Sequence, residues 1–247
     1  MDPGLAGLIQ AGLAALLVGF SKTGMPGLGI LIVPLMASAF PARESVGVLL
    51  PVLMCGDVFA VARYRRYPEW RLLRRLLPWV VGGIVLGAAA LKVLTSGLLE
   101  YFIGAMVLGL IALQAARSWR GEWLEEHLPR KWWFSASMGA LAGFSTGVAN
   151  LAGPVTGVYF ISMGLRKHAF IGSAAVFFMA VNWIKVPFYA KLGLLTRDSL
   201  AFDLRMFPLV AAGAAVGMLT FRYIPQKWFN RIILTLAALS AVKLLLF

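Results

Sequence analysis

Residues 19–29 read GFSKTGMPGLG and interrupt the first apolar run of the chain. A related stretch, GFSTGVANLAGP at residues 143–154, interrupts a later apolar run. Glycine permits backbone conformations that are closed to other residues, and proline removes a hydrogen-bond donor. We therefore predict a break in helical structure at both places.

The two glycine-rich stretches belong to a longer internal repeat. Their order is continued by further matches between the halves of the chain: Gly47 with Gly172, Met54 with Met179, Asp57 with Asn182, Tyr64 with Tyr189, Gly83 with Gly213, and Gly87 with Gly217. A collinear series of this kind indicates one structural unit present twice. We expect residues 1–122 to form the first membrane repeat and residues 123–247 the second.

Each copy contains five apolar segments. They lie at residues 5–21, 26–40, 44–64, 75–94 and 98–116, and at residues 133–148, 151–164, 168–188, 205–221 and 228–246. A helix needs about 20 apolar residues to cross a bilayer, so the second segment of each copy is short. The sequence predicts an all-α polytopic membrane protein in which the first two segments of each copy are short, broken or re-entrant. Such a unit crosses an odd number of times, so the second copy is inverted relative to the first, as in many secondary transporters.

Composition and charge place the chain in the membrane. Of its 247 residues, 60% are hydrophobic and only 13% are charged, with a formal net charge of +13. The basic residues gather between apolar runs, at residues 63–75, 117–131 and 222–231. This pattern indicates orientation by the positive-inside rule and not nucleic-acid binding. We expect a multi-pass protein of the inner (plasma) membrane, with cytoplasmic basic loops and both termini on the outer side.

The two breaks are the candidate substrate site. The amino ends of half-helices offer free N–H groups and a positive dipole end, which suit an anion. We expect eight residues of the breaks to bind substrate: Ser21, Lys22, Thr23, Gly24, Ser145, Thr146, Gly147 and Asn150. Lys22 adds charge, and an ammonium within the membrane indicates function by default. The alternative is that Lys22 reaches out to interfacial water.

Three further polar residues lie in the third segments of the two copies, one in the first copy and two in the second. Asp57 occupies an apolar run, where a carboxylate must pair with a cation or titrate abnormally; Lys22 and an arginine of the following loop are the candidate partners. Asn182 matches Asp57, and Lys185 follows it by three residues on the same helical face. We assign these three residues to coupling or gating. The alternatives are a structural ion pair for Asp57 and snorkelling for Lys185.

Other motifs point away from enzymatic function. Lys22-Thr23 resembles the end of a phosphate-binding loop, but serine precedes the lysine where that motif requires glycine. His127 and His168 have poor metal partners nearby, and Cys55 is a single cysteine in an apolar run. We expect no enzymatic activity, no cofactor and no metal. The spacing of Gly83 with Gly87, and of Gly213 with Gly217, is typical of helix packing.

The residues described above resemble the TauE/SafE sulfite exporter family, also called the 4-toluene sulfonate uptake permease family. The resemblance is carried by GFSKTGMPGLGILIVPLMASAFPARESVGVLLPVLMCGDVFAVARYRR at residues 19–66, and more loosely by residues 143–154 and Asn182. It implies a membrane transporter for sulfite, sulfonates or other organosulfur anions.

Three functions remain open on the sequence. The first is a secondary transporter that moves a small sulfur-containing anion by alternating access, with the anion and the lipid bilayer as its partners. The second is an ion channel, or a cation or metal permease, on the same scaffold, with Asp57 and Asn182 as ligands. The third is a membrane partner or assembly factor without transport. The sequence leaves the oligomeric state open, a homodimer included.

Overall fold

The computed structural model describes residues 4–24, 28–127 and 132–220. Within these ranges the chain forms nine α-helices and no strand: α1 (Gly4–Thr23), α2 (Gly29–Ala39), α3 (Ala42–Tyr64), α4 (Trp70–Val93), α5 (Ser96–His127), α6 (Trp132–Ala149), α7 (Gly153–Ser162), α8 (Lys167–Lys191) and α9 (Arg197–Thr220). The tenth expected segment, at residues 228–246, lies outside the described residues.

Five of these helices, α1, α3, α4, α8 and α9, are long and apolar enough to cross a membrane. They contain 20 to 25 residues, and a rise of about 1.5 Å per residue carries them across roughly 30 Å of hydrocarbon. The prediction of an all-helical, multi-pass membrane protein is confirmed. By contrast, α2 has 11 residues and α7 has 10, so each rises only about 15–16 Å.

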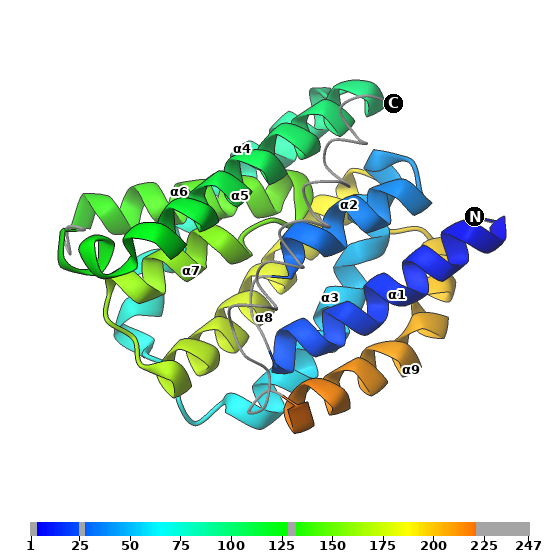
Figure 1. The fold of residues 1–247 in the computed structure, drawn as a ribbon. Coiled ribbons are helices and arrows are strands. Elements are labelled where there is room, and N and C mark those ends of the chain that lie inside the picture. Colours follow the sequence, from blue (N-terminus) through cyan, green and yellow to red (C-terminus); the bar gives the residue numbers. More distant parts are fainter. Residues whose placement is uncertain (1–3, 25–27, 128–131, 221–247) are drawn as a thin grey trace.

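The long helices pack in pairs that join the two halves of the sequence. Figure 1 shows α1 beside α9 at one flank and α4 beside α6 at the other, with α3 and α8 between them. In each flanking pair, one helix comes from the first half of the chain and its partner from the second. The molecule is therefore one interlocked unit whose halves share their helix contacts.

Glycines set the distance between the paired helices. At four positions a methyl group in place of the glycine hydrogen would overlap a backbone carbonyl oxygen of the partner helix: Gly19 with Val210, Gly213 with Leu16, Gly83 with Ala140, and Gly143 with Val80. The next glycines along, Gly87 and Gly217, also lie against the backbone of the partner helix. The predicted packing role of the two GxxxG pairs is confirmed.

The breaks in the helices are shorter than the sequence predicts. Helix α1 continues through Thr23 and α6 through Ala149, so most of each glycine-rich stretch is helical. The reason is packing: Gly19 and Gly143 serve close helix contacts, and these contacts favour a regular helix. In the second stretch the irregular backbone is limited to residues 150–152, which join α6 to α7.

Three helices extend beyond the apolar segments predicted for them. Helix α4 begins at Trp70, α9 begins at Arg197, and α5 reaches His127. The added residues include many arginines and glutamates. These residues favour helical backbone even though they cannot remain in hydrocarbon, so hydropathy alone predicts these helices to be too short.

Candidate functional site

A cavity lies between the two halves of the molecule, lined by residues of α1, α2, α3, α6, α7 and α8 and by Asn150. Its polar lining consists of Ser21, Lys22, Thr146, Asn150 and Asn182. A volume of about 50 Å³ within it is open to the centre of a water-sized sphere. A single water needs roughly 10–15 Å³ by this measure, so the cavity accommodates a group of a few non-hydrogen atoms.

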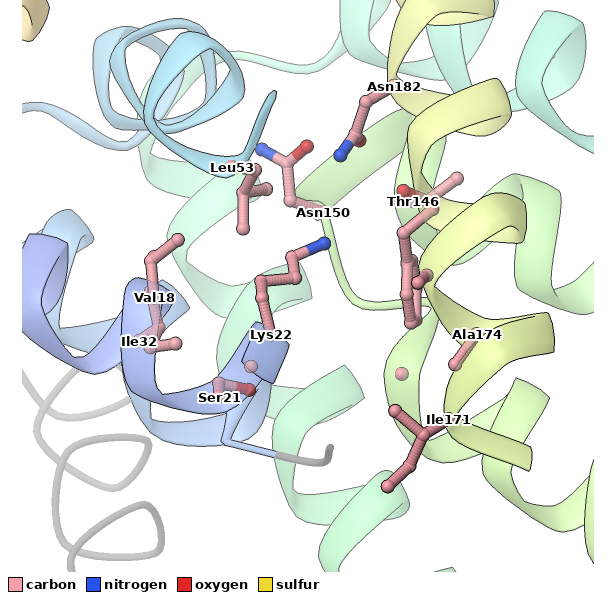
Figure 2. A pocket seen from close by; sticks show the side chains of 14 residues that line it. Val18, Ser21, Lys22, Ile32, Leu53, Thr146, Asn150, Ile171, Ala174 and Asn182 are labelled. Carbon is pink, nitrogen blue, oxygen red and sulfur yellow. The ribbon is translucent and has the colours of Figure 1, made fainter. Parts of the chain in front are cut away.

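Lys22 reaches the cavity from the last turn of α1. Figure 2 shows its side chain extending towards Asn150 and Asn182. Its Nζ lies 2.6 Å from Oδ1 of Asp57 and 4.2 Å from the centre of the Phe178 ring. Gly56 makes room for the lysine, because a Cβ atom at Gly56 would lie only 3.0 Å from the Lys22 Cγ. Lys22 thus points inward to a carboxylate.

Asp57 is fully buried in α3 and contacts both halves of the molecule. Besides the ion pair with Lys22, its Oδ2 accepts a hydrogen bond of 2.6 Å from the Nδ2 of Asn182 on α8. Lys22, and not an arginine of the following loop, is the cation that compensates this carboxylate. Charge-assisted hydrogen bonds of this kind hold both partners in fixed orientations.

Lys185 is the second cation of the site, and it is fully buried in α8. Its Nζ donates a hydrogen bond of 3.1 Å to Oγ1 of Thr146 and another to Oδ1 of Asn150. Within the described part of the chain, Lys185 makes no ion pair with a carboxylate. The amino group is therefore bonded to neutral oxygens inside the molecule, and it does not reach out to interfacial water.

Asn150 shapes the link between α6 and α7. Its backbone φ of 59° lies in the left-handed region, which asparagine tolerates better than most residues. Its Oδ1 accepts from Lys185, while its Nδ2 donates a hydrogen bond of 3.0 Å to the backbone oxygen of Val46 in α3. One side chain thus turns the chain, orients the buried lysine and ties the link to the other half of the molecule.

Two tyrosines fix the ends of the helices that lead into the site. Tyr64 donates a hydrogen bond of 2.7 Å to the backbone oxygen of Thr23 in α1. Tyr189 lies within 3.2 Å of the backbone oxygens of Thr146 and Gly147 in α6. The last carbonyls of a helix lack partners within the helix, so both hydroxyls stabilise helix ends where the regular backbone stops.

The short helices α2 and α7 both begin at the cavity. Their first residues, Gly29 and Gly153, belong to its lining. The amino end of a helix carries unpaired N–H groups and the positive end of the helix dipole. The expected amino ends are thus present at the cavity, where they add to the positive potential of the lysines.

Half of the residues expected to bind substrate lie elsewhere. Thr23 hydrogen-bonds to the backbone oxygens of Gly19 and Ala214, between α1 and α9. Gly24 packs against Gly217, and Gly147 packs against Ile84 and Gly87. The Ser145 hydroxyl donates to the backbone oxygen of Leu141 within α6. None of these four residues, Thr23, Gly24, Ser145 and Gly147, belongs to the lining of the cavity.

The sequence analysis missed an apolar wall of the cavity. On α8 the wall is formed by Ile171, Ala174, Ala175 and Phe178, which precede Asn182 on the same helix. Their spacing of three to four residues follows one helical face. Counting back from Asn182 along that face would have identified them.

The family model for the sulfite exporter TauE/SafE matches residues 11–244. The chain belongs to the TauE/SafE family. No curated protein and no solved structure matches it. Membership of the TauE/SafE family, together with five membrane-length apolar helices, makes this chain a multi-pass membrane protein of an anion-exporter type.

Proposed function

We propose that this TauE/SafE protein is a secondary transporter that moves a small sulfur-containing anion across the inner membrane by alternating access. The observation that carries the proposal is the cavity, which Lys22 lines and behind which Lys185 is bonded to the lining residues Thr146 and Asn150. Lys22 comes from α1 and Lys185 from α8, and both reach the contact between α3, α6 and α8. Two ammonium groups, helix amino ends and amide groups form an environment that suits an oxyanion.

The size of the cavity supports a small substrate. An opening of about 50 Å³ for a water-sized sphere fits the sulfur and oxygens of a sulfite or sulfonate head group. The apolar wall from Ile171 to Phe178 lies beside the polar groups, so an organic substituent on the sulfur also has a place. The TauE/SafE description supplies the sulfur chemistry.

We further propose that residues 1–122 and 123–247 are two inverted repeats. Matched residues in the two halves make matched contacts: Tyr64 donates to the carbonyl of Thr23, and Tyr189 donates to that of Gly147, the position that matches Thr23. The glycine crossings of α1 with α9 and of α4 with α6 are reciprocal as well. Short α2 and α7, each spanning about half a bilayer, fit re-entrant segments.

The paired helices suggest how access alternates. Helices α1 with α9, and α4 with α6, are held at close distance by glycines, which makes each pair suited to move as a rigid body. Between them, α3 and α8 meet through the bond from Asn182 to Asp57. We propose that the two pairs rock about this central contact, with Asp57, Asn182 and Lys185 coupling anion binding to the movement.

The basic side of the molecule supports an orientation. All six arginines near the corner between α3 and α4 are exposed: Arg63, Arg65, Arg66, Arg71, Arg74 and Arg75. By the positive-inside rule this corner faces the cytoplasm. Tyr64 at the same corner contacts the end of α1, so Gly4 at the start of α1 faces outward.

A cation or metal permease is the weaker candidate. Asp57 already carries an ammonium at 2.6 Å, so its carboxylate is not free to bind a metal ion. Hard cations also favour several carboxylates, whereas the charged groups at this site are mainly cationic.

The proposed function is tested by transport in proteoliposomes. Purified protein is reconstituted, and entry of radiolabelled sulfite and of 4-toluenesulfonate is measured against empty vesicles. We expect uptake by the native protein and its loss in Lys185→Gln. Lys92→Gln, which removes an exposed lysine at the end of α4, is the matched control and should transport normally. Equal uptake by both variants, at equal reconstituted amounts, would remove the proposed site.

A further inference from the structure

The buried charges of the site do not balance. Three ionisable groups meet there: the amino groups of Lys22 and Lys185 and the carboxyl group of Asp57. Lys22 is the only charged residue among those that line the cavity within the described chain, and Asp57 and Lys185 stand directly behind the lining. Counting formal charges gives two positive and one negative, so the cluster carries a single positive charge.

The geometry assigns distinct roles to the two lysines. Lys22 is neutralised at 2.6 Å by Asp57, which Asn182 fixes from the other side. Lys185 hydrogen-bonds to the neutral oxygens of Thr146 and Asn150, and among the described residues no carboxylate lies within ion-pair distance of it. A charge in a dry interior is costly unless a charge of opposite sign accompanies it. An anion bound in the cavity near Lys185 would supply such an opposite charge.

We infer that the site selects a singly charged oxyanion and that Asp57 sets this valence. Asp57 neutralises Lys22, so only the charge of Lys185 remains for the substrate to balance. One negative charge brings the cluster to neutrality, whereas a doubly charged anion leaves one uncompensated negative charge in a low-dielectric cavity. This inference rests on the proposed function, because it concerns the substrate of the same site.

Methanesulfonate and sulfate are suitable probes, because both are tetrahedral at sulfur and they differ by one charge. Their dissociation constants are measured by calorimetry on the purified protein in detergent. Native protein should bind methanesulfonate more tightly than sulfate. In Asp57→Asn the cluster has two positive charges. The affinity for sulfate relative to methanesulfonate should therefore rise by about tenfold or more, since close charges interact strongly in such a site.

The chain offers a matched control. Asp198 in the first turn of α9 is an exposed carboxylate outside the lining of the cavity. Asp198→Asn removes one negative charge just as Asp57→Asn does, but it should leave the preference for methanesulfonate unchanged. A shift in both variants would mean that the preference follows the overall charge of the protein, which would overturn the inference.

A second variant changes the charge without touching the ion pair. Ile171→Lys adds a cation to the apolar wall of the cavity. It should also raise the affinity for sulfate relative to methanesulfonate. If Asp57→Asn fails to fold, this variant decides. An unchanged ratio in the folded variants would overturn the role assigned to Asp57 while leaving anion transport intact. Failure of native protein to bind either anion would instead contradict the proposed function.

Discussion

Asn182 donates a hydrogen bond from its side-chain amide to the carboxylate of Asp57, over a distance of 2.6 Å. The two residues occupy matching positions in the two halves of the sequence. A central contact of the molecule therefore joins matching positions of the two halves, with a carboxylate on one side and an amide on the other. This asymmetry permits one ion pair, and in our proposal it leaves a single positive charge for a ligand.

The first prediction concerns the ion pair between Lys22 and Asp57. Lys22→Met leaves a fully buried carboxylate without its cation, and we expect a loss of about 3–5 kcal/mol in the free energy of unfolding. The double variant Lys22→Met/Asp57→Leu removes both charges and should recover much of this loss. Chemical unfolding in detergent, followed by circular dichroism, measures both. A double variant no more stable than Lys22→Met would show that the carboxylate is compensated by other groups.

The second prediction concerns the glycine crossing of α4 with α6. Gly83→Ala would place a methyl group on the carbonyl oxygen of Ala140 and push the helices apart, at a cost of about 1–3 kcal/mol. Gly82, its neighbour on the same helix, has open space at its Cβ position. Gly82→Ala should be neutral or stabilising by up to about 1 kcal/mol, because alanine favours the helix. Equal melting temperatures for the two variants would contradict the proposed close contact.

Much of the fold could be predicted from the sequence. Nine of the ten expected apolar segments correspond to helices in the described chain, because long apolar runs leave a membrane helix as almost the only structure that satisfies the backbone. The ends of α4, α5 and α9 could not be predicted in this way. Arginine and glutamate continue a helix into water, and hydropathy does not register that continuation.

The candidate site was only partly predictable. Ser21, Lys22, Thr146 and Asn150 line the cavity, but Thr23, Gly24, Ser145 and Gly147 do not. The sequence identifies which polar residues accompany a break, yet the direction of each side chain depends on which helix packs against it. Thr23 illustrates the point, because its hydroxyl reaches the carbonyl of Ala214 on α9, about 190 residues away along the chain.

The third prediction separates the backbone role of Asn150 from its side-chain role. Asn150→Gly keeps the left-handed conformation available but removes the contacts with Lys185 and Val46. We expect it to fold and to bind methanesulfonate more weakly. Asn150→Ala also strains the backbone and should be less stable than Asn150→Gly by about 1 kcal/mol. Thermal unfolding and calorimetry measure the two effects, and unaltered binding in Asn150→Gly would exclude the proposed side-chain role.

The fourth prediction concerns orientation. In a Cys55→Ala background, a cysteine replacing Arg66 should react with a membrane-impermeant maleimide only in inverted membrane vesicles, because this corner is predicted to face the cytoplasm. A cysteine replacing Lys191, an exposed residue at the far end of α8, should react only in intact cells. Reaction of both from the same side would contradict the proposed path of α8 across the membrane.

The central claim is that an anion binds in the cavity beside Lys22, close to the buried Lys185, and it is tested most directly by locating an anion there. Hydrogen selenite at mildly acidic pH is a singly charged analogue with a strong anomalous signal. In crystals of the protein grown with it, we predict a selenium peak in the cavity, with an oxygen within hydrogen-bonding distance of the Lys22 Nζ. A peak confined to the exposed arginines between α3 and α4, with the cavity empty, would contradict the account.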